Sequence, residues 1–191
     1  MTELIPSVQF ILIITSVIYA LCLAPLLSGV VRLLQTEKPV RYFVPHTIWA
    51  IQMFISVIVV WWTMWGFREV EWHFATFLYV VIEPTVLYIA CSLTFPHSFE
   101  GAEVDLEAHM TRVWRPLLVS MMTLSLLIYA DGVILTDEPL WHSGRPLQLL
   151  MLTTSAWAFI YNRRITLFVT PVVLLTSIII IVALRFWTPA G

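Results

Sequence analysis

The sequence predicts an all-α integral membrane protein that folds as one polytopic bundle of six transmembrane helices. Of 191 residues, 60% are hydrophobic and 12% are charged, whereas an average soluble domain has about 25% charged residues. A helix needs about 20 mostly apolar residues to cross the bilayer. Six apolar stretches occur, at about 8–34, 46–66, 73–95, 116–135, 147–161 and 166–187, of which the fifth is the weakest. The segments between them are short, so we expect 1–191 to be a single transmembrane domain.

The basic residues predict the orientation of this bundle. Seven of the ten flank the first, third and fifth connections, namely Arg32, Lys38, Arg41, Arg112, Arg115, Arg163 and Arg164. The other three, Arg68, Arg145 and Arg185, fall on the opposite side. Cytoplasmic loops are enriched in Lys and Arg, so the odd loops are expected in the cytoplasm and both termini outside it. The net charge of −2 offers no basic patch, so nucleic acid is not expected as a partner.

The first predicted span carries a row of small side chains. They recur every four residues, at Ser16, Ala20, Ala24 and Ser28, and so lie on one side of a helix. Small residues allow close approach between membrane helices. The row therefore predicts a packing face, either within the bundle or between copies of the chain.

Two features are typical of contact with lipid. Tryptophans end the second span and open the third, at Trp61, Trp62, Trp65 and Trp72. Indole rings favour the membrane interface, so we expect an aromatic belt; a platform for a pigment, a quinone or a partner helix is the alternative. At the other boundary Arg163 and Arg164 form the turn between the last two spans, where they suit phospholipid headgroups.

The third span contains an ionisable carboxyl and a helix breaker side by side. In EWHFATFLYVVIEPTVLYIACSLTFP, residues 71–96, Glu83 and Pro84 interrupt the apolar run. Counted from His73, Glu83 is roughly 15 Å into the helix, near the bilayer middle. An ionised carboxylate there is costly. We therefore expect Glu83 to be protonated, paired or facing water.

Hydroxyl groups lead toward this carboxyl. Thr76 and Tyr79 share the helix face of Glu83. Pro84 has no N–H to donate, which frees the carbonyl of Val80. A titratable group at mid-depth, hydroxyls leading to it and a free carbonyl are the components of a proton or cation pathway. The alternative is structural: a neutral Glu83 hydrogen-bonded to a Ser, Thr or Tyr of a neighbouring helix.

Asp131 is the other acid that this pathway could use. It lies near the outer end of the fourth span, where it could form an outer vestibule with Arg145 and His142. We expect no second acid at the depth of Glu83. No span contains a lysine, so a basic partner would have to reach in from a helix end.

Metal and cofactor sites are not predicted. In SFEGAEVDLEAHMTRVWR, carboxylates and an imidazole alternate at Glu103, Asp105, Glu107 and His109. Four-residue spacing in a helix could hold a divalent metal, but an exposed acidic segment is usually solvated surface. Covalent retinal is excluded, because the one lysine, Lys38, is in a loop.

Haem held by two histidines is not expected either. It needs two histidines at similar depth. His46 and His73 fall at opposite membrane faces, and His97, His109 and His142 are expected in loops. No catalytic motif stands out, which leaves cofactors unknown apart from lipid and gives no basis for an enzyme.

Four stretches resemble a known group of proteins: LLSGVVRLLQ, HTIWAIQMFISVIVVWWTMWGF, FLYVVIEPTVLYIACSLTFP and DLEAHMTRVWRP. They are similar to a family of small six-helix bacterial membrane proteins, over roughly the first 120 residues. The family brings no assigned activity and no assigned residues. The resemblance implies a multi-pass protein of the bacterial cytoplasmic (inner) membrane.

Two functions are compatible with these features. The first is a small, homo-oligomeric channel or transporter in which Glu83 is a proton or cation site and Pro84 shapes the path. The second is a non-catalytic accessory subunit that packs against a larger bioenergetic or transport complex. The row of small residues and the tryptophan-rich rim suit such association.

Overall fold

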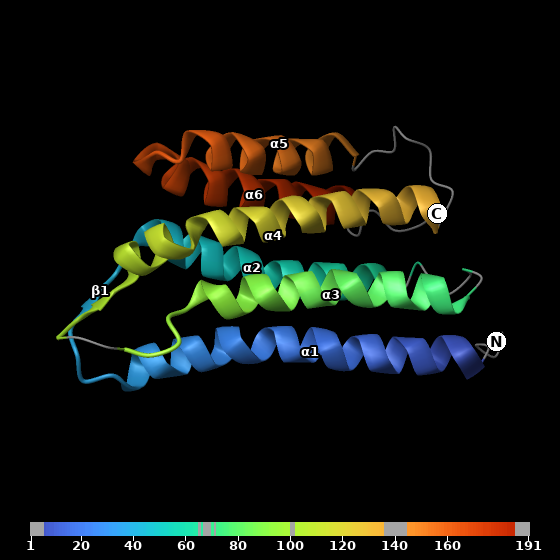
Figure 1. Cartoon of the computed structure of the whole chain (residues 1–191), viewed down its shortest axis with the longest axis horizontal. Coiled ribbons are helices and arrows are strands. Elements are labelled where there is room, and N and C mark those ends of the chain that lie inside the picture. Colours follow the sequence, from blue (N-terminus) through green and yellow to red (C-terminus); the bar gives the residue numbers. More distant parts are fainter. Residues whose placement is uncertain are drawn as a thin grey trace.

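A computed structural model describes residues 6–64, 66, 70, 72–99, 102–135 and 145–185. Its helices are α1 (Pro6–Gln35), α2 (Val44–Thr63), α3 (Phe74–Thr94), α4 (Leu106–Ile134), α5 (Arg145–Tyr161) and α6 (Arg164–Arg185). They lie side by side with their axes roughly aligned (Figure 1). We call the end where α1 begins and α6 ends the termini end. The opposite, strand end carries β1 (Val40–Arg41) and β2 (Val104–Asp105).

The helices are those of a multi-pass membrane protein. Among the described residues, α1, α2, α3, α4 and α6 are long and apolar enough to cross a membrane. Helix α5 has 17 residues, a length of about 25 Å at about 1.5 Å per residue, and is not among them. Large apolar side chains such as Leu34, Phe74 and Ile160 are exposed on the outside of the bundle. The predicted all-α membrane fold is confirmed at this level.

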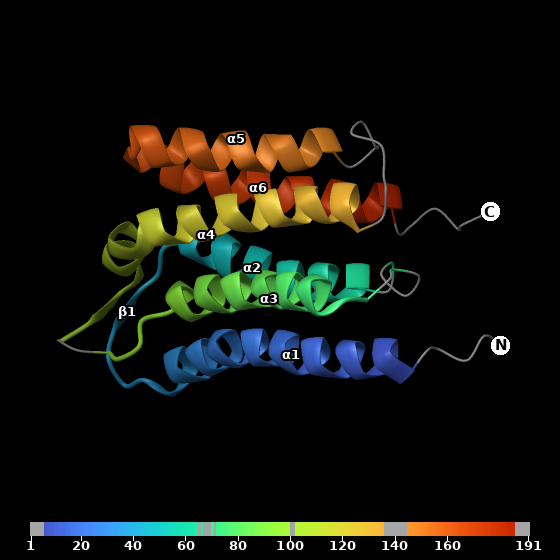
Figure 2. The same cartoon turned by 45° about the vertical axis from the view of Figure 1, so that its right-hand side comes forward.

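The order of packing separates two halves of the bundle. Helix α1 packs mainly on α3, α3 packs on α4, and α4 packs on α5. Helix α6 packs on α2 and α5. Figure 2 shows α4 between the α1 and α3 pair and the α5 and α6 pair. Helix α4 therefore contacts α3 on one side and α5 on the other.

Helix α4 begins earlier than the sequence predicted. It starts at Leu106, not near residue 116, and Pro116 lies inside it. The side chain of Asp105 accepts a hydrogen bond from the backbone N–H of Ala108 at 2.9 Å, which caps the helix. As a result His109, which we expected in a loop, is on a helix.

Ion pairs tie the connections together at the strand end. Strands β1 and β2 pair in parallel, with Val40 opposite Val104. Arg41 contacts Asp105 at 3.0 Å and Glu107 at 3.3 Å, and Arg164 contacts Glu107 at 2.8 Å. Asp105 and Glu107, considered above as metal ligands, are thus paired with arginine.

The turn between α5 and α6 has a left-handed backbone at Asn162, with φ 38°. Asn tolerates this conformation well and often ends a helix in this way. Arg163 after it is exposed. Arg164 is committed to Glu107, which leaves Arg163 as the better candidate for a lipid headgroup.

Helix α1 packs on α3 through a face next to the predicted one. Tyr19, Cys22 and Leu26 are buried. A Cβ added to Gly29 would lie 2.3 Å from Cγ of Phe95, so only glycine permits this approach. Of the predicted row, Ala20, Ala24 and Ser28 are exposed. Ser16 accepts a hydrogen bond from Nε1 of Trp61 at 3.1 Å.

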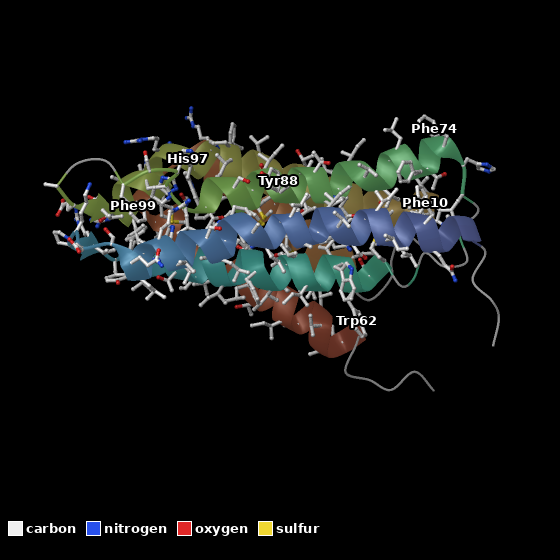
Figure 3. All side chains as sticks on the ribbon, turned by 90° about the horizontal axis from the view of Figure 1, so that it is seen from below. Phe10, Trp62, Phe74, Tyr88, His97 and Phe99 are labelled. Atoms are coloured by element: carbon white, nitrogen blue, oxygen red, sulfur yellow. The ribbon has the colours of Figure 1, made fainter. Side chains whose placement is uncertain are left out.

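The termini end carries exposed aromatic side chains. Figure 3 looks onto α1, with Phe10 and Phe74 at this end and His97 and Phe99 at the strand end. Trp61 and Trp62 are exposed and Trp72 is half-buried. Trp65 lies outside the described residues. The exposed indoles of Trp61 and Trp62 lie at the termini end, where the sequence predicts the aromatic belt.

Candidate functional site

Two carboxyl groups meet in the interior of the bundle. Glu83 of α3 and Asp131 of α4 are joined by a side-chain hydrogen bond. They are 3% and 6% exposed. An ionised carboxylate can only accept, so one of the two groups must carry the proton that forms this bond. The pair therefore holds a shared proton, and the expectation of no second acid beside Glu83 was wrong.

Tyrosine hydroxyls surround the pair. The hydroxyl of Tyr79 donates to the carbonyl of Leu127 at 3.0 Å and also contacts the Asp131 carboxyl. The hydroxyl has one proton, which it donates either to the Leu127 carbonyl or to the Asp131 carboxylate. The hydroxyl of Tyr19, on α1, lies within electrostatic range of both acids. That hydroxyl is buried and has no hydrogen-bond partner among the described residues.

The arginine at the start of α5 supplies a positive charge. Arg145 is 2% exposed and its Nη1 donates to the carbonyl of Tyr129. Its guanidinium lies 4.5 Å from the centre of the Tyr129 ring and interacts electrostatically with Asp131. Arg145 is the arginine expected beside Asp131, and it reaches into the bundle from the start of α5.

These groups balance in charge. With one shared proton, Glu83 and Asp131 carry a single negative charge, which Arg145 compensates. A buried charge is tolerated only when it is paired in this way. Loss of the proton would leave one uncompensated negative charge inside the bundle. The cluster is therefore suited to bind and release one proton, or to exchange it for one monovalent cation.

Pro84 adds a backbone acceptor next to the pair. It lies inside α3 and has no N–H for the carbonyl of Val80, which is on a residue 1% exposed. The carbonyl of Pro84 itself accepts from Sγ of Cys22 at 3.3 Å. Helix α3 continues through Pro84 from Phe74 to Thr94, so the predicted break does not interrupt the helix.

The structure brings together only part of the predicted site. Glu83, Tyr79 and Asp131 meet, together with Arg145. In the described part of the chain, no hydrogen bond connects the half-buried Thr76 to this cluster. His142 lies outside the described residues.

Two histidines also meet, at the strand end. The rings of His46 and His109 have centroids 6.3 Å apart. Their Nε2 atoms bind adjacent carbonyls at the end of α3, Thr94 at 2.8 Å and Leu93 at 3.0 Å. The prediction that His109 lies in a loop was wrong, because α4 holds it beside His46. Within the described residues, no three His, Cys, Asp or Glu side chains gather to hold a metal.

Comparison with known proteins assigns neither a family nor a function to this chain. No protein-family model, curated protein or solved structure matches this chain. The resemblance to small six-helix bacterial membrane proteins stays a prediction. The function is therefore inferred from the geometry of the cluster.

Proposed function

We propose that this chain is a small channel or transporter with the Glu83–Asp131 pair as its ion site. The observation that carries the proposal is the hydrogen bond between two buried acids inside a bundle of membrane-length helices. A bond of this kind contains a proton that can be released and regained. Intramembrane acids of this type mark proton and ion pathways.

The proton is the ion that the cluster favours. One proton and Arg145 together neutralise both carboxyls, so uptake of one proton gives a neutral interior. A monovalent cation in place of the proton would need oxygen ligands. The hydroxyl of Tyr19 and the carbonyl of Val80 could supply them, which makes proton–cation exchange the second mode of the same site.

The proposal includes the placement of the chain in the membrane. Helix α5 would cross with the other helices as a short sixth span, by local thinning of the bilayer. The strand end would face the cytoplasm of a bacterium and both termini would lie outside. The exposed Arg112, Arg115 and Arg163 near the strand end support this orientation.

Proton flux in proteoliposomes tests the proposal. The full chain is reconstituted with a pH-sensitive dye inside the vesicles, and a proton gradient is applied. We expect Glu83→Gln to reduce the proton flux strongly, because an amide, unlike a carboxyl group, does not release a proton in water. Glu103→Gln is the matched control, since Glu103 is exposed outside the cluster. Equal flux in the wild-type chain and Glu83→Gln would reject the assigned role.

An accessory subunit is the second candidate. The exposed row of Ala20, Ala24 and Ser28 on α1 favours close packing with a helix of another chain. The native mass after gentle extraction distinguishes the two. A multiple of 22.0 kDa indicates a homo-oligomer, whereas a fixed ratio to other chains indicates a subunit of a larger complex.

A further inference from the structure

A second set of polar side chains occupies the space between α2 and α4. From the strand end, the His46 and His109 rings come first, 6.3 Å apart. The Trp49 and Trp114 rings follow, with centroids 5.4 Å apart. Nε2 of Gln52 then contacts Sδ of Met121 at 3.6 Å. We call this set, extended by two serines, the α2–α4 file: His46, Trp49, Gln52 and Ser56 with His109, Trp114, Met121 and Ser125.

The spacing in the sequence creates this file. The four α2 members are separated by three, three and four residues, which places them along one face of the helix. Their exposed fractions are 3%, 1%, 0% and 4%. A membrane helix therefore directs an imidazole, an indole, an amide and a hydroxyl to its buried side, where apolar residues would pack at lower cost.

Several polar atoms of the file are buried without a hydrogen bond. Within the described residues, Nε1 of Trp49, Nε1 of Trp114 and Oε1 of Gln52 have no partner. Buried polar atoms in proteins are usually satisfied by protein groups or by ordered water. Two donors and one acceptor in sequence along the file are the groups that a chain of water molecules needs.

The file leads into an enclosed cavity between α2, α4, α5 and α6. The cavity measures about 80 Å³ and its lining includes Ser56, Met121, Ser125 and Gln148. A single water needs about 10–15 Å³ of such space and two to four polar partners. Oε1 of Gln148 is a further buried acceptor without a partner among the described residues. The rest of the lining is mainly apolar and includes Val60, Leu124 and Ile178, so water held in the cavity would bond to Ser56, Ser125 and Gln148.

The cavity ends one helical turn from the acid pair, and the file begins at an open cleft. Ile128 and Gln148 line the cavity and lie three residues from Asp131 and Arg145, about one helical turn. At the other end, His109 lines an open polar cleft of about 520 Å³. The file and the cavity thus lie in sequence between the strand end and the helical turns that carry Asp131 and Arg145.

We propose that the α2–α4 file is hydrated and carries protons between the strand-end cleft and the Glu83–Asp131 pair. The proposal rests on the proposed function. Each transfer forms one O–H or N–H bond as it breaks another, so no oxidant or reductant is involved. Nε2 of each histidine faces a carbonyl, which only accepts, so in the neutral ring Nε2 carries the hydrogen and Nδ1 is the proton acceptor.

Hydroxyl-radical footprinting tests whether the file is wet. Radicals made by X-rays from internal water oxidise nearby methionine, and Met121 and Met151 line the cavity. Met53 and Met110 are matched controls, because they are 0% and 1% exposed and do not line it. In the full chain in lipid nanodiscs, we expect Met121, which is 2% exposed, to oxidise several-fold faster than the controls. Equally slow rates at Met121, Met53 and Met110 would overturn the proposal.

Proton flux in the Gln52→Leu variant tests whether the α2–α4 file carries protons. Leucine has a similar size and no polar atoms, so we expect proton flux to fall about tenfold. The infrared band of the protonated carboxyl should stay unchanged, because the acid pair is intact. Met53→Leu, one residue away, should keep wild-type flux. Full flux in Gln52→Leu would refute proton conduction by the α2–α4 file and leave the proposed function intact. Absent flux in the wild-type chain would refute the proposed function. In that case the footprinting experiment alone would decide whether the file is hydrated.

Discussion

A side-chain hydrogen bond joins Glu83 to Asp131 across the interface between α3 and α4, and neither residue is more than 6% exposed. The two residues come from different predicted spans, and neither has another acid near it in its own span. Their hydrogen bond turns two costly buried acids into one compensated group. Stability and transport should therefore both depend on the pair and on Arg145.

The shared proton should be visible directly. Glu83→Gln keeps the size of the side chain and removes one of the two acids. The remaining Asp131 would then keep Arg145 as its charge partner and should ionise. We expect the infrared carbonyl band of a protonated carboxyl, present in the wild-type chain at neutral pH, to disappear. Asp105→Asn, at the surface of the strand end, should leave the band unchanged; persistence of the band in Glu83→Gln would argue against sharing.

Arg145 should stabilise the fold through the acid pair. Removal of one partner of a buried ion pair costs about 3–5 kcal/mol, because a charge remains without compensation. Arg145→Gln should therefore lower the thermal unfolding temperature in detergent. The double variant Arg145→Gln with Asp131→Asn should recover part of the loss. Strictly additive losses in this cycle would show that the two groups are not coupled.

The contact of Gly29 with Phe95 should be sensitive to a single methyl group. An added Cβ would lie 2.3 Å from the ring, so α1 and α3 would have to separate. We expect Gly29→Ala to reduce the free energy of unfolding by about 1–3 kcal/mol. Gly66→Ala is the control, since nothing lies within 4 Å of its added Cβ. Denaturation of both variants in one detergent makes the comparison, and equal stability would contradict the close packing.

Protonation of Asp105 at low pH should destabilise the strand end. The Ala108 backbone N–H, and then Arg41, hold the pKa of this carboxyl below its ordinary value of 3.8. A lowered pKa in the folded state means that the stabilisation is complete above the ordinary pKa and is lost as the pH falls through the folded value. Amide hydrogen exchange at 104–108 should therefore rise below about pH 4. Asp105→Asn should exchange faster at neutral pH and lose most of this pH dependence.

The sequence predicted the helices better than the contacts between them. Apolar runs located all six helices, because length and hydropathy are local properties. The start of α4 was missed because Asp105 reads as one acid among several, and only its bond to Ala108 makes it a cap. The row from Ser16 to Ser28 indicated a packing face, whereas the buried face is set by the fit of Gly29 against Phe95.

The candidate site was predicted in part for the same reason. The depth of Glu83 follows from counting along one helix, and Tyr79 follows from the helix period. The bond from Glu83 to Asp131 depends on how α3 and α4 pack, which no single segment encodes. Arg145 was expected near Asp131 in an outer vestibule, but charge counting cannot show that its guanidinium is buried in the bundle.

Proton flux in Asp131→Asn compared with Glu83→Gln and the double variant tests the central claim most directly. If the two acids act as one ion site, each single variant should lose about a hundredfold or more in flux, and the double variant should lose little beyond that. The chains are reconstituted in equal amounts and the same gradient is applied to each. Wild-type flux in Asp131→Asn would contradict the claim that the pair is the ion site.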